Sequence, residues 1–468
     1  MSHYLPMLIL AAGAVLVFII GAIAPAARKL FRTISLLTAL AAMIAALCMT
    51  PDLGHSLVDT SSYARFFVML LTGLTFLTLL FGSRYARRRG FERDEFHALM
   101  LLSGLGMCLF AASRDWIMAA IGLEMISLPL YVLLAARRGS ALSLEAAVKY
   151  FVLGAVASVM FFFGAALLYA ASGSLDIMQS LAGGNPGLTL LGLGFILGGL
   201  SFKLSLAPVH LWTPDVLQGA PAPIAAFLSG GSKVAVFALL LRVTLSASPA
   251  VWQAAEPLLW IMAALSMTGG TLGALTQNRV KRMMAYSSVA HMGYLVLALL
   301  AARSAGAGPA LFAAAAFGIM DVAVFGSLGL LSPVSEDADL IETVRGIGLR
   351  HPKQAALLMI SLLTLGGLPP TVGFVSKIVV FRASLSAGYF WLSVIGVIWA
   401  IVGVFYVLRV LVAMYATDHV NDAGAQTLPT PGFTGWLALA LSALLLIGLG
   451  ILPTPVLSAA AAVLTHLP

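Results

Sequence analysis

The sequence predicts an all-α polytopic membrane protein with about fourteen transmembrane helices. Of its 468 residues, 61% are hydrophobic and 9% are charged, whereas a soluble domain carries about 25% charged residues. Apolar runs of about 20 residues, the length that crosses the bilayer core, recur along the whole chain. A mean hydropathy of +1.02 leaves too little polar surface for an ordinary water-soluble protein.

Each expected span is a run of mostly apolar residues with charges gathered at its ends. In chain order the runs cover 5–25, 30–50, 63–82, 96–112, 116–136, 144–171, 188–219, 222–245, 252–275, 284–302, 308–331, 354–386, 389–415 and 432–455. The connecting loops are short, and the longest lies around 332–353. We therefore expect no soluble domain able to hold a nucleotide or a metal cluster.

The net charge of +8 does not indicate a nucleic-acid binder, because the cations occur in short clusters between apolar runs. Cys48 and Cys108 are the only cysteines and lie in separate runs, away from any metal-ligand spacing. The pattern therefore predicts no disulfide, haem attachment or iron–sulfur site.

The loop cations predict the orientation, because Lys and Arg are retained on the cytoplasmic side. Loops after odd-numbered spans hold sixteen cations and loops after even-numbered spans hold five. We expect the odd loops to face the cytoplasm and both termini to face the outer side. The first run lacks a preceding positive charge and is followed by Arg28, Lys29 and Arg32, which favours a retained span over a signal peptide.

Four lysines lie inside apolar runs, where a charged side chain costs about 2.5–3.5 kcal/mol and commonly marks an ion or proton path. They are Lys149, Lys203, Lys233 and Lys377. Lys149 follows Glu145 by four residues, so it is either a paired interfacial lysine or a functional one. The Gly230-Gly231 pair before Lys233 can bend its helix and expose carbonyl groups.

Lys203 and Lys377 lie in spans seven and twelve, which Pro and Gly interrupt at APVHLWTPDVLQGAP and GGLPPTVG. Such interruptions line cavities, because the freed backbone groups need partners. An offset of five spans predicts two repeats of opposite topology. We expect an N-terminal three-helix segment at 1–95, a first five-helix repeat at 96–245, a second, inverted one at 252–415, and the fourteenth helix within 416–468.

Three further titratable groups lie at membrane depth. Glu124 in span five is a candidate partner for Lys203, although burial could also keep it as a neutral acid. His291 is a candidate relay, and His210 could instead satisfy the broken backbone beside Pro208. Asp321 is either a relay member or the partner of a buried cation.

Several long stretches resemble the N subunits of bacterial proton-pumping NADH:quinone oxidoreductase, respiratory complex I, in the antiporter-like, Mrp-related family. The similarity covers roughly residues 92–415, and the forms HLWTPDVLQGAP and SSVAHMGY distinguish this chain from the paralogous L and M subunits and from Mrp subunits.

The resemblance implies proton translocation across the bacterial cytoplasmic (inner) membrane, driven by redox chemistry elsewhere. It assigns Glu124 as the acid of span five, Lys203 to the first half-channel, Lys233 to the central relay and Lys377 to the exit. Lys149 and His291 match further polar positions, whereas Asp321 replaces a Ser or Asn.

The resemblance also implies partners: other membrane-arm subunits, including antiporter-like paralogues, membrane lipids, protons and water, with no nucleic acid. It implies no cofactor on this chain and places NADH, FMN, iron–sulfur clusters and quinone on partner subunits. Two alternatives stay open. One is an Mrp-type cation/proton antiporter subunit, and the other is a structural membrane subunit whose buried charges have no role.

Overall fold

The computed structural model describes residues 4–50, 57–332, 339–417 and 430–462, which fold into helices joined by short connections. The helices are α1 (Leu5–Ile23), α2 (Arg28–Leu47), α3 (Ser62–Arg88), α4 (Asp94–Ala111), α5 (Trp116–Leu134), α6 (Ala141–Ser172), α7 (Ile177–Ala182), α8 (Pro186–Leu204), α9 (Trp212–Gly219), α10 (Ala222–Ala226), the π-helix η2 (Phe227–Ser232), α11 (Lys233–Ser246), α12 (Pro249–Leu275), α13 (Val280–Ala305), α14 (Gly308–Leu330), the 3₁₀ helix η3 (Ile341–Val344), α15 (Ile347–Arg350), α16 (Pro352–Gly366), α17 (Val372–Ser386), α18 (Phe390–Met414), α19 (Phe433–Ile451) and α20 (Thr454–Ala462).

The predicted membrane architecture is confirmed. Thirteen helical segments of the described ranges are long and apolar enough to cross a bilayer. The short helices α16 and α17 together occupy the expected twelfth span, which brings the number to fourteen. The expected fourteenth span is too long at its end, because α19 stops at Ile451 and a separate helix, α20, follows Pro453.

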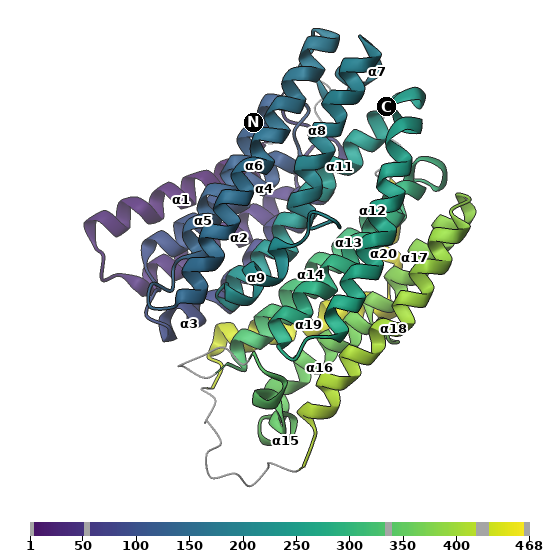
Figure 1. The fold of residues 1–468 in the computed structure, drawn as a ribbon. Coiled ribbons are helices and arrows are strands. Elements are labelled where there is room, and N and C mark those ends of the chain that lie inside the picture. The colour runs from purple at the N-terminus through teal and green to yellow at the C-terminus, as the bar shows by residue number, and fades with distance from the viewer. Residues whose placement is uncertain (1–3, 51–56, 333–338, 418–429, 463–468) are drawn as a thin grey trace.

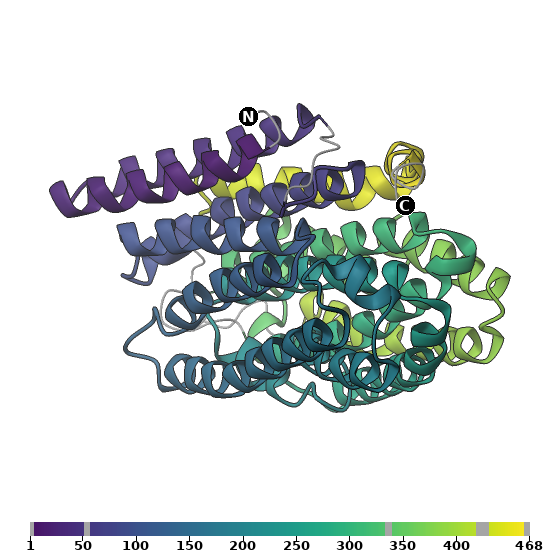
Figure 2. The same cartoon turned by 90° about the horizontal axis from the view of Figure 1, so that it is seen from above.

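The helices run side by side, and Figure 2 shows that they form several layers. The Ala222–Ser246 and Gly308–Leu330 segments are buried over most of their length and form the centre. Helices α1, α6, α18 and α19 lie at the periphery and expose large apolar side chains. Because a bilayer favours apolar surface, this distribution fits lipid on the outside and the costly polar groups at the centre.

Both expected helix breaks are present, and in each the first half-helix ends at a residue with left-handed backbone. Helix α8 is followed by Ser205 at φ 62°, and α16 is followed by Gly367 at φ 72°. Prolines follow within three residues and prevent the helix from continuing. The backbone carbonyls at these ends therefore lack their usual helical partners.

The segment before Lys233 is a π-helix, Phe227–Ser232, so the predicted irregularity at the glycine pair is present. Its glycines also serve packing: a Cβ on Gly230 would lie 2.7 Å from the Gly318 oxygen of α14. The irregular turn thus brings the start of α11 directly against α14, at the centre of the molecule.

Candidate functional site

Lys203 lies at the end of α8, is 2% exposed, and donates a hydrogen bond from Nζ to Ser127 Oγ at 2.8 Å. Its ammonium group also faces the rings of Tyr131 and Tyr150, at 5.7 and 5.2 Å from their centroids. Glu124, one helical turn before Ser127 on α5, is within electrostatic range of Lys203. Glu124 Oε1 is buried and has no hydrogen-bond partner among the described residues. Lys203 therefore bonds to Ser127, on the same helix as Glu124, and the Glu124 carboxylate acts on it through its charge.

Lys233, the first residue of α11, is fully buried and donates from Nζ to Ser288 Oγ at 2.7 Å. Ser288 lies 2.9 Å from Ser229 Oγ, which in turn donates to the Asp321 carboxylate of α14. Asp321 is within electrostatic range of Lys233. Of the two roles expected for Asp321, this geometry favours the partner of a buried cation.

His291 lies between the central and the last lysine, within electrostatic range of both Lys233 and Lys377. Its Nδ1 is 2.7 Å from the Ser287 carbonyl oxygen, and the Ser287 hydroxyl lies 2.7 Å from the Tyr406 hydroxyl. His291 and Lys377 also line one cavity of about 30 Å³. A cavity of that size has room for a water molecule, and His291, Ser376 and Lys377 supply polar groups to walls that are otherwise mostly apolar.

Lys377 lies in α17 and donates to the carbonyl oxygens of Leu365 and Gly366, at 3.3 and 3.0 Å. These carbonyls end α16, so the break in the twelfth span supplies the acceptors for its own lysine. The Lys377 ammonium also faces the Tyr294 ring, 5.7 Å from its centroid. Lys203 and Lys377 therefore differ: Lys203 precedes its break and binds a side chain, whereas Lys377 follows its break and binds backbone.

Lys149 and His210 lie beside these groups. Lys149 forms ion pairs with Glu145 at 2.6 Å, as its spacing predicted, and with Asp215 of α9 at 2.7 Å. The His210 ring, in the connection between α8 and α9, lies 6.4 Å from the Tyr286 ring. It is also within electrostatic range of Lys233.

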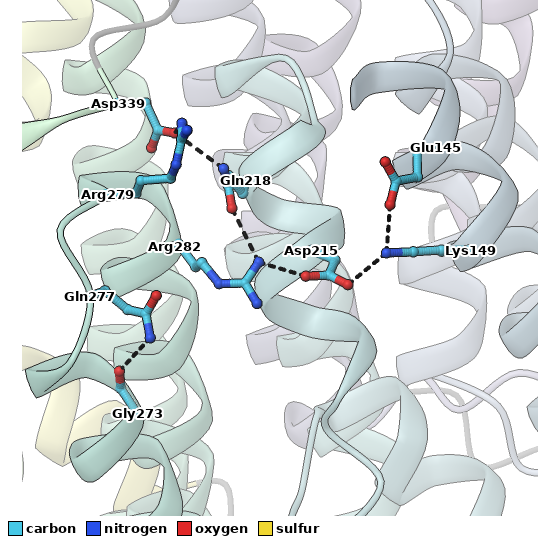
Figure 3. Close-up of polar contacts among 9 residues, drawn as sticks. All are labelled: Glu145, Lys149, Asp215, Gln218, Gly273, Gln277, Arg279, Arg282 and Asp339. Carbon is cyan, nitrogen blue, oxygen red and sulfur yellow. Dashed lines mark hydrogen bonds and ion pairs between the residues drawn. The ribbon is translucent and has the colours of Figure 1, made fainter. Parts of the chain in front are cut away.

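Asp215 belongs to a network of charged and amide side chains that joins α6, α9 and α13 (Figure 3). Asp215 accepts from Arg282 at 2.5 Å, and Arg282 donates to Gln218 at 3.2 Å. Gln218 reaches Asp339 at 3.3 Å, and Arg279 pairs with Asp339 at 2.9 Å. The network therefore holds the short half-helix α9, which follows the break after Lys203, from both sides.

The sequence reasoning missed the hydroxyl groups that contact Lys203, Lys233, Asp321 and His291 or lie next to those contacts, together with Asp215. The missed residues are Ser127, Ser229, Ser287, Ser288, Tyr406 and Asp215. A buried serine is common in membrane helices, so composition alone does not distinguish a connecting hydroxyl from a packing one. Asp215 carried a signal, because it is an acid inside the interrupted seventh span.

No group of three or more His, Cys, Asp or Glu side chains placed to hold a metal ion occurs within residues 4–50, 57–332, 339–417 and 430–462. The titratable groups described above are instead distributed as separate sites on facing helices. Such an arrangement suits the movement of protons between neighbouring groups.

The family model described as "NADH:quinone oxidoreductase/Mrp antiporter, TM" matches residues 113–403. The chain is 50% identical over 402 residues to "NADH-quinone oxidoreductase subunit N 1" of Solidesulfovibrio magneticus, covering 86% of this chain and 87% of that protein. It is 41% identical over 468 residues to "NADH-quinone oxidoreductase subunit N" of Geobacter metallireducens, covering 98% of each.

Solved structures agree with these sequence matches. A chain of respiratory complex I from Thermus thermophilus superposes with a TM-score of 0.84 at 34% identity, over 98% of this chain and 99% of that one. A chain of the Mrp complex from Dietzia has the same fold, with a TM-score of 0.87 at 18% identity, over 100% and 97% of the two chains. The chain therefore belongs to the NADH:quinone oxidoreductase/Mrp antiporter family, as an antiporter-like membrane subunit of the subunit N type.

Proposed function

We propose that this subunit translocates protons across the bacterial inner membrane through Glu124, Lys203, Lys233, His291 and Lys377. One observation carries the proposal: Lys203, Lys233 and Lys377 each have a titratable neighbour within electrostatic range, which is Glu124, Asp321 and His291 in turn. Burying isolated charges is costly, so such groups are retained where they serve a path.

The chemistry of each step is proton exchange between a donor and an acceptor. An ammonium Nζ gives its proton to an adjoining hydroxyl or water, which at the same time passes its own proton to the next acceptor. The lysine is left as a neutral amine, which then accepts a proton from the group on its other side. Ser127 and Ser288 are suited to such exchange, because a hydroxyl both donates and accepts. Waters would complete the path where the described side chains do not meet, as the cavity beside His291 and Lys377 allows.

The driving force would come from other subunits. We propose that NADH, FMN, iron–sulfur clusters and quinone bind to partners in the complex, and that their redox cycle changes the interaction of Glu124 with Lys203. Antiporter-like paralogues would be the neighbouring membrane-arm subunits. The excess of cations in the odd-numbered loops supports cytoplasmic odd loops and both termini outside.

The test is made in the whole complex, reconstituted in vesicles, with Glu124→Gln and Lys203→Met. We expect each variant to lower the number of protons moved per NADH oxidised, because each removes one exchange site. Lys353→Met, an exposed lysine outside the buried groups, is the control. An unchanged ratio in both variants, with the subunit assembled, would contradict the proposal.

A second function, an Mrp-type cation/proton antiporter subunit, is favoured by the fold shared with the Dietzia Mrp complex. It predicts sodium-dependent proton movement in vesicles that contain this chain and receive no NADH. Purification separates the two functions: co-isolation of this chain with quinone-reducing subunits favours the first, and co-isolation with Mrp-type subunits favours the second.

A further inference from the structure

A basic groove lies on the surface where α2 begins, α3 ends and α19 begins. It has a volume of about 660 Å³, and its lining includes Arg32, Leu37, Arg84, Arg87, Arg88 and Phe433. None of the residues proposed for proton movement, Glu124, Lys203, Lys233, His291 and Lys377, lines this groove. The groove therefore needs an explanation separate from proton movement.

The packing of three helices produces the groove. Helices α2 and α19 both pack on α3, which lies between them. Figure 2 shows the N-terminal helices and the yellow helix α19 along the same side of the molecule. Helix α3 thus supplies three arginines to the floor, while α2 and α19 supply walls that combine an arginine with apolar side chains.

The charge extends beyond the groove into a second hollow of about 470 Å³, lined by Ala26, Ala27, Arg28, Lys29, Leu30 and Arg87. Arg87 lines both hollows, so six cations form one continuous basic surface. No described lining residue of either hollow is acidic. The nearby Glu92 is 1% exposed, accepts from Nε of Arg87 at 2.7 Å, and has His97 Nε2 at 3.7 Å.

The walls become apolar toward the middle of the helices. Leu37 and Ile44 are 59% and 52% exposed and lie seven residues apart, on one face of α2. Phe433 and Trp436 of α19 are exposed on the other wall. A ligand of this surface must therefore carry negative charge at one end and long apolar groups at the other.

We propose that this groove binds an anionic phospholipid, with its phosphate on Arg32 and Arg84 and its acyl chains along α2 and α19. Arg88, which donates to the Gly329 carbonyl oxygen at 3.2 Å, adds positive charge beside them. Basic pockets between transmembrane helices recognise acidic lipid headgroups, and guanidinium groups pair with phosphate oxygens by two parallel hydrogen bonds. The bound lipid would connect the N-terminal three-helix segment to the C-terminal helix.

The experiment titrates delipidated, purified complex with dioleoylphosphatidylglycerol or dioleoylphosphatidylcholine and counts the bound lipids by native mass spectrometry. We expect wild-type complex to retain phosphatidylglycerol at this site in preference to phosphatidylcholine. The double variant Arg32→Gln/Arg84→Gln should bind it about 25-fold more weakly, because each cation near an anionic headgroup contributes about a fivefold factor.

Two controls keep the test specific. Arg84→Lys keeps the charge and should bind phosphatidylglycerol nearly as well as wild type. Arg138→Gln removes an exposed cation from another loop and should leave phosphatidylglycerol binding unchanged. Equal binding of both lipids, or unchanged phosphatidylglycerol binding in the double variant, would overturn the proposal. Loss of a neighbouring subunit with lipid binding unchanged would also overturn it, since an acidic protein segment would then be the occupant.

Discussion

Lys233 of α11 and Asp321 of α14 are joined by two serine hydroxyls in the fully buried centre of the molecule. Lys233 donates to Ser288, Ser288 lies 2.9 Å from Ser229, and Ser229 donates to Asp321. A buried charge of either sign alone is costly, and the two charges offset each other across these hydroxyls. The acid that departs from the pattern of the resembling family therefore has a local physical reason.

Asp321→Asn should lower the thermal stability of the assembled subunit, because it leaves the Lys233 ammonium buried without its carboxylate. Removing one partner of a buried ion pair costs about 3–5 kcal/mol, and the intervening serines and deprotonation of the lysine would reduce this value. Thermal unfolding of the purified complex measures the effect. The double variant Lys233→Met/Asp321→Asn should recover part of the loss. Wild-type stability in Asp321→Asn would refute the pairing.

Gly367→Ala should displace Lys377 from the carbonyls at the end of α16. A Cβ at position 367 would lie 2.8 Å from both Cδ and Nζ of Lys377, closer than such contacts allow. We expect fewer protons moved per NADH oxidised in a complex that still assembles. Gly388→Ala is a matched control, because Gly388 has a similarly left-handed φ of 89° and open space around it. Equal effects of both variants would attribute the loss to backbone strain alone.

The sequence predicted the spans and both breaks because hydrophobic length and proline act locally. Hydrophobicity marks a span wherever it lies in the fold, and a proline interrupts its own helix. Of the four lysines in apolar runs, Lys203 and Lys233 are buried, whereas Lys149 and Lys377 are partly exposed. Their cost in an apolar run identified all four before any contact was known.

The partners of these lysines could not be predicted, because they depend on how helices pack. Lys203 and Lys377 occupy similar motifs, yet one binds Ser127 of a different helix and the other binds carbonyls of its own broken span. The two cases differ because Lys203 precedes the break in its span and Lys377 follows the break in its own. The break before α20 is a different case, because Pro453 and Pro455 marked it locally and the apolar residues on both sides led the span to be drawn through it.

Asp215→Asn should loosen the half-helix α9, which it ties to Lys149 of α6 and Arg282 of α13 (Figure 3). These side chains are partly exposed, so each pair contributes modestly and weakens with salt. We expect faster hydrogen exchange in 205–219, and a smaller difference from wild type at high salt. Glu145→Gln is the control, because it removes the exposed partner of Lys149 and leaves both Asp215 contacts. Unchanged exchange in Asp215→Asn would show that packing alone holds α9.

Asp59 and Arg242 form an ion pair that joins the start of α3 to α11, and this pair makes the stability of the protein depend on pH. Asp59 lies before α3 and accepts from Arg242 of α11 at 2.5 Å and from Ser61 N and Oγ at 2.9 and 2.7 Å. Burial raises the pKa of Asp59, but the Arg242 charge and the Ser61 hydrogen bonds outweigh it and hold that pKa below its usual value.

Because the folded pKa of Asp59 is lowered, its stabilisation is complete above the unfolded value of about 4 and is lost as the pH falls through the folded value. Asp59→Asn should therefore unfold at a lower temperature than wild type at pH 7, by an amount that corresponds to about 1–3 kcal/mol. The difference in unfolding temperature between wild type and Asp59→Asn should become smaller below about pH 4, where the wild-type carboxylate gains a proton. Arg242→Gln should show the same narrowing, and the double variant should lose little more than either single one. A gap that stays constant from pH 7 to pH 3 would show that packing, and not the ion pair, joins α3 to α11.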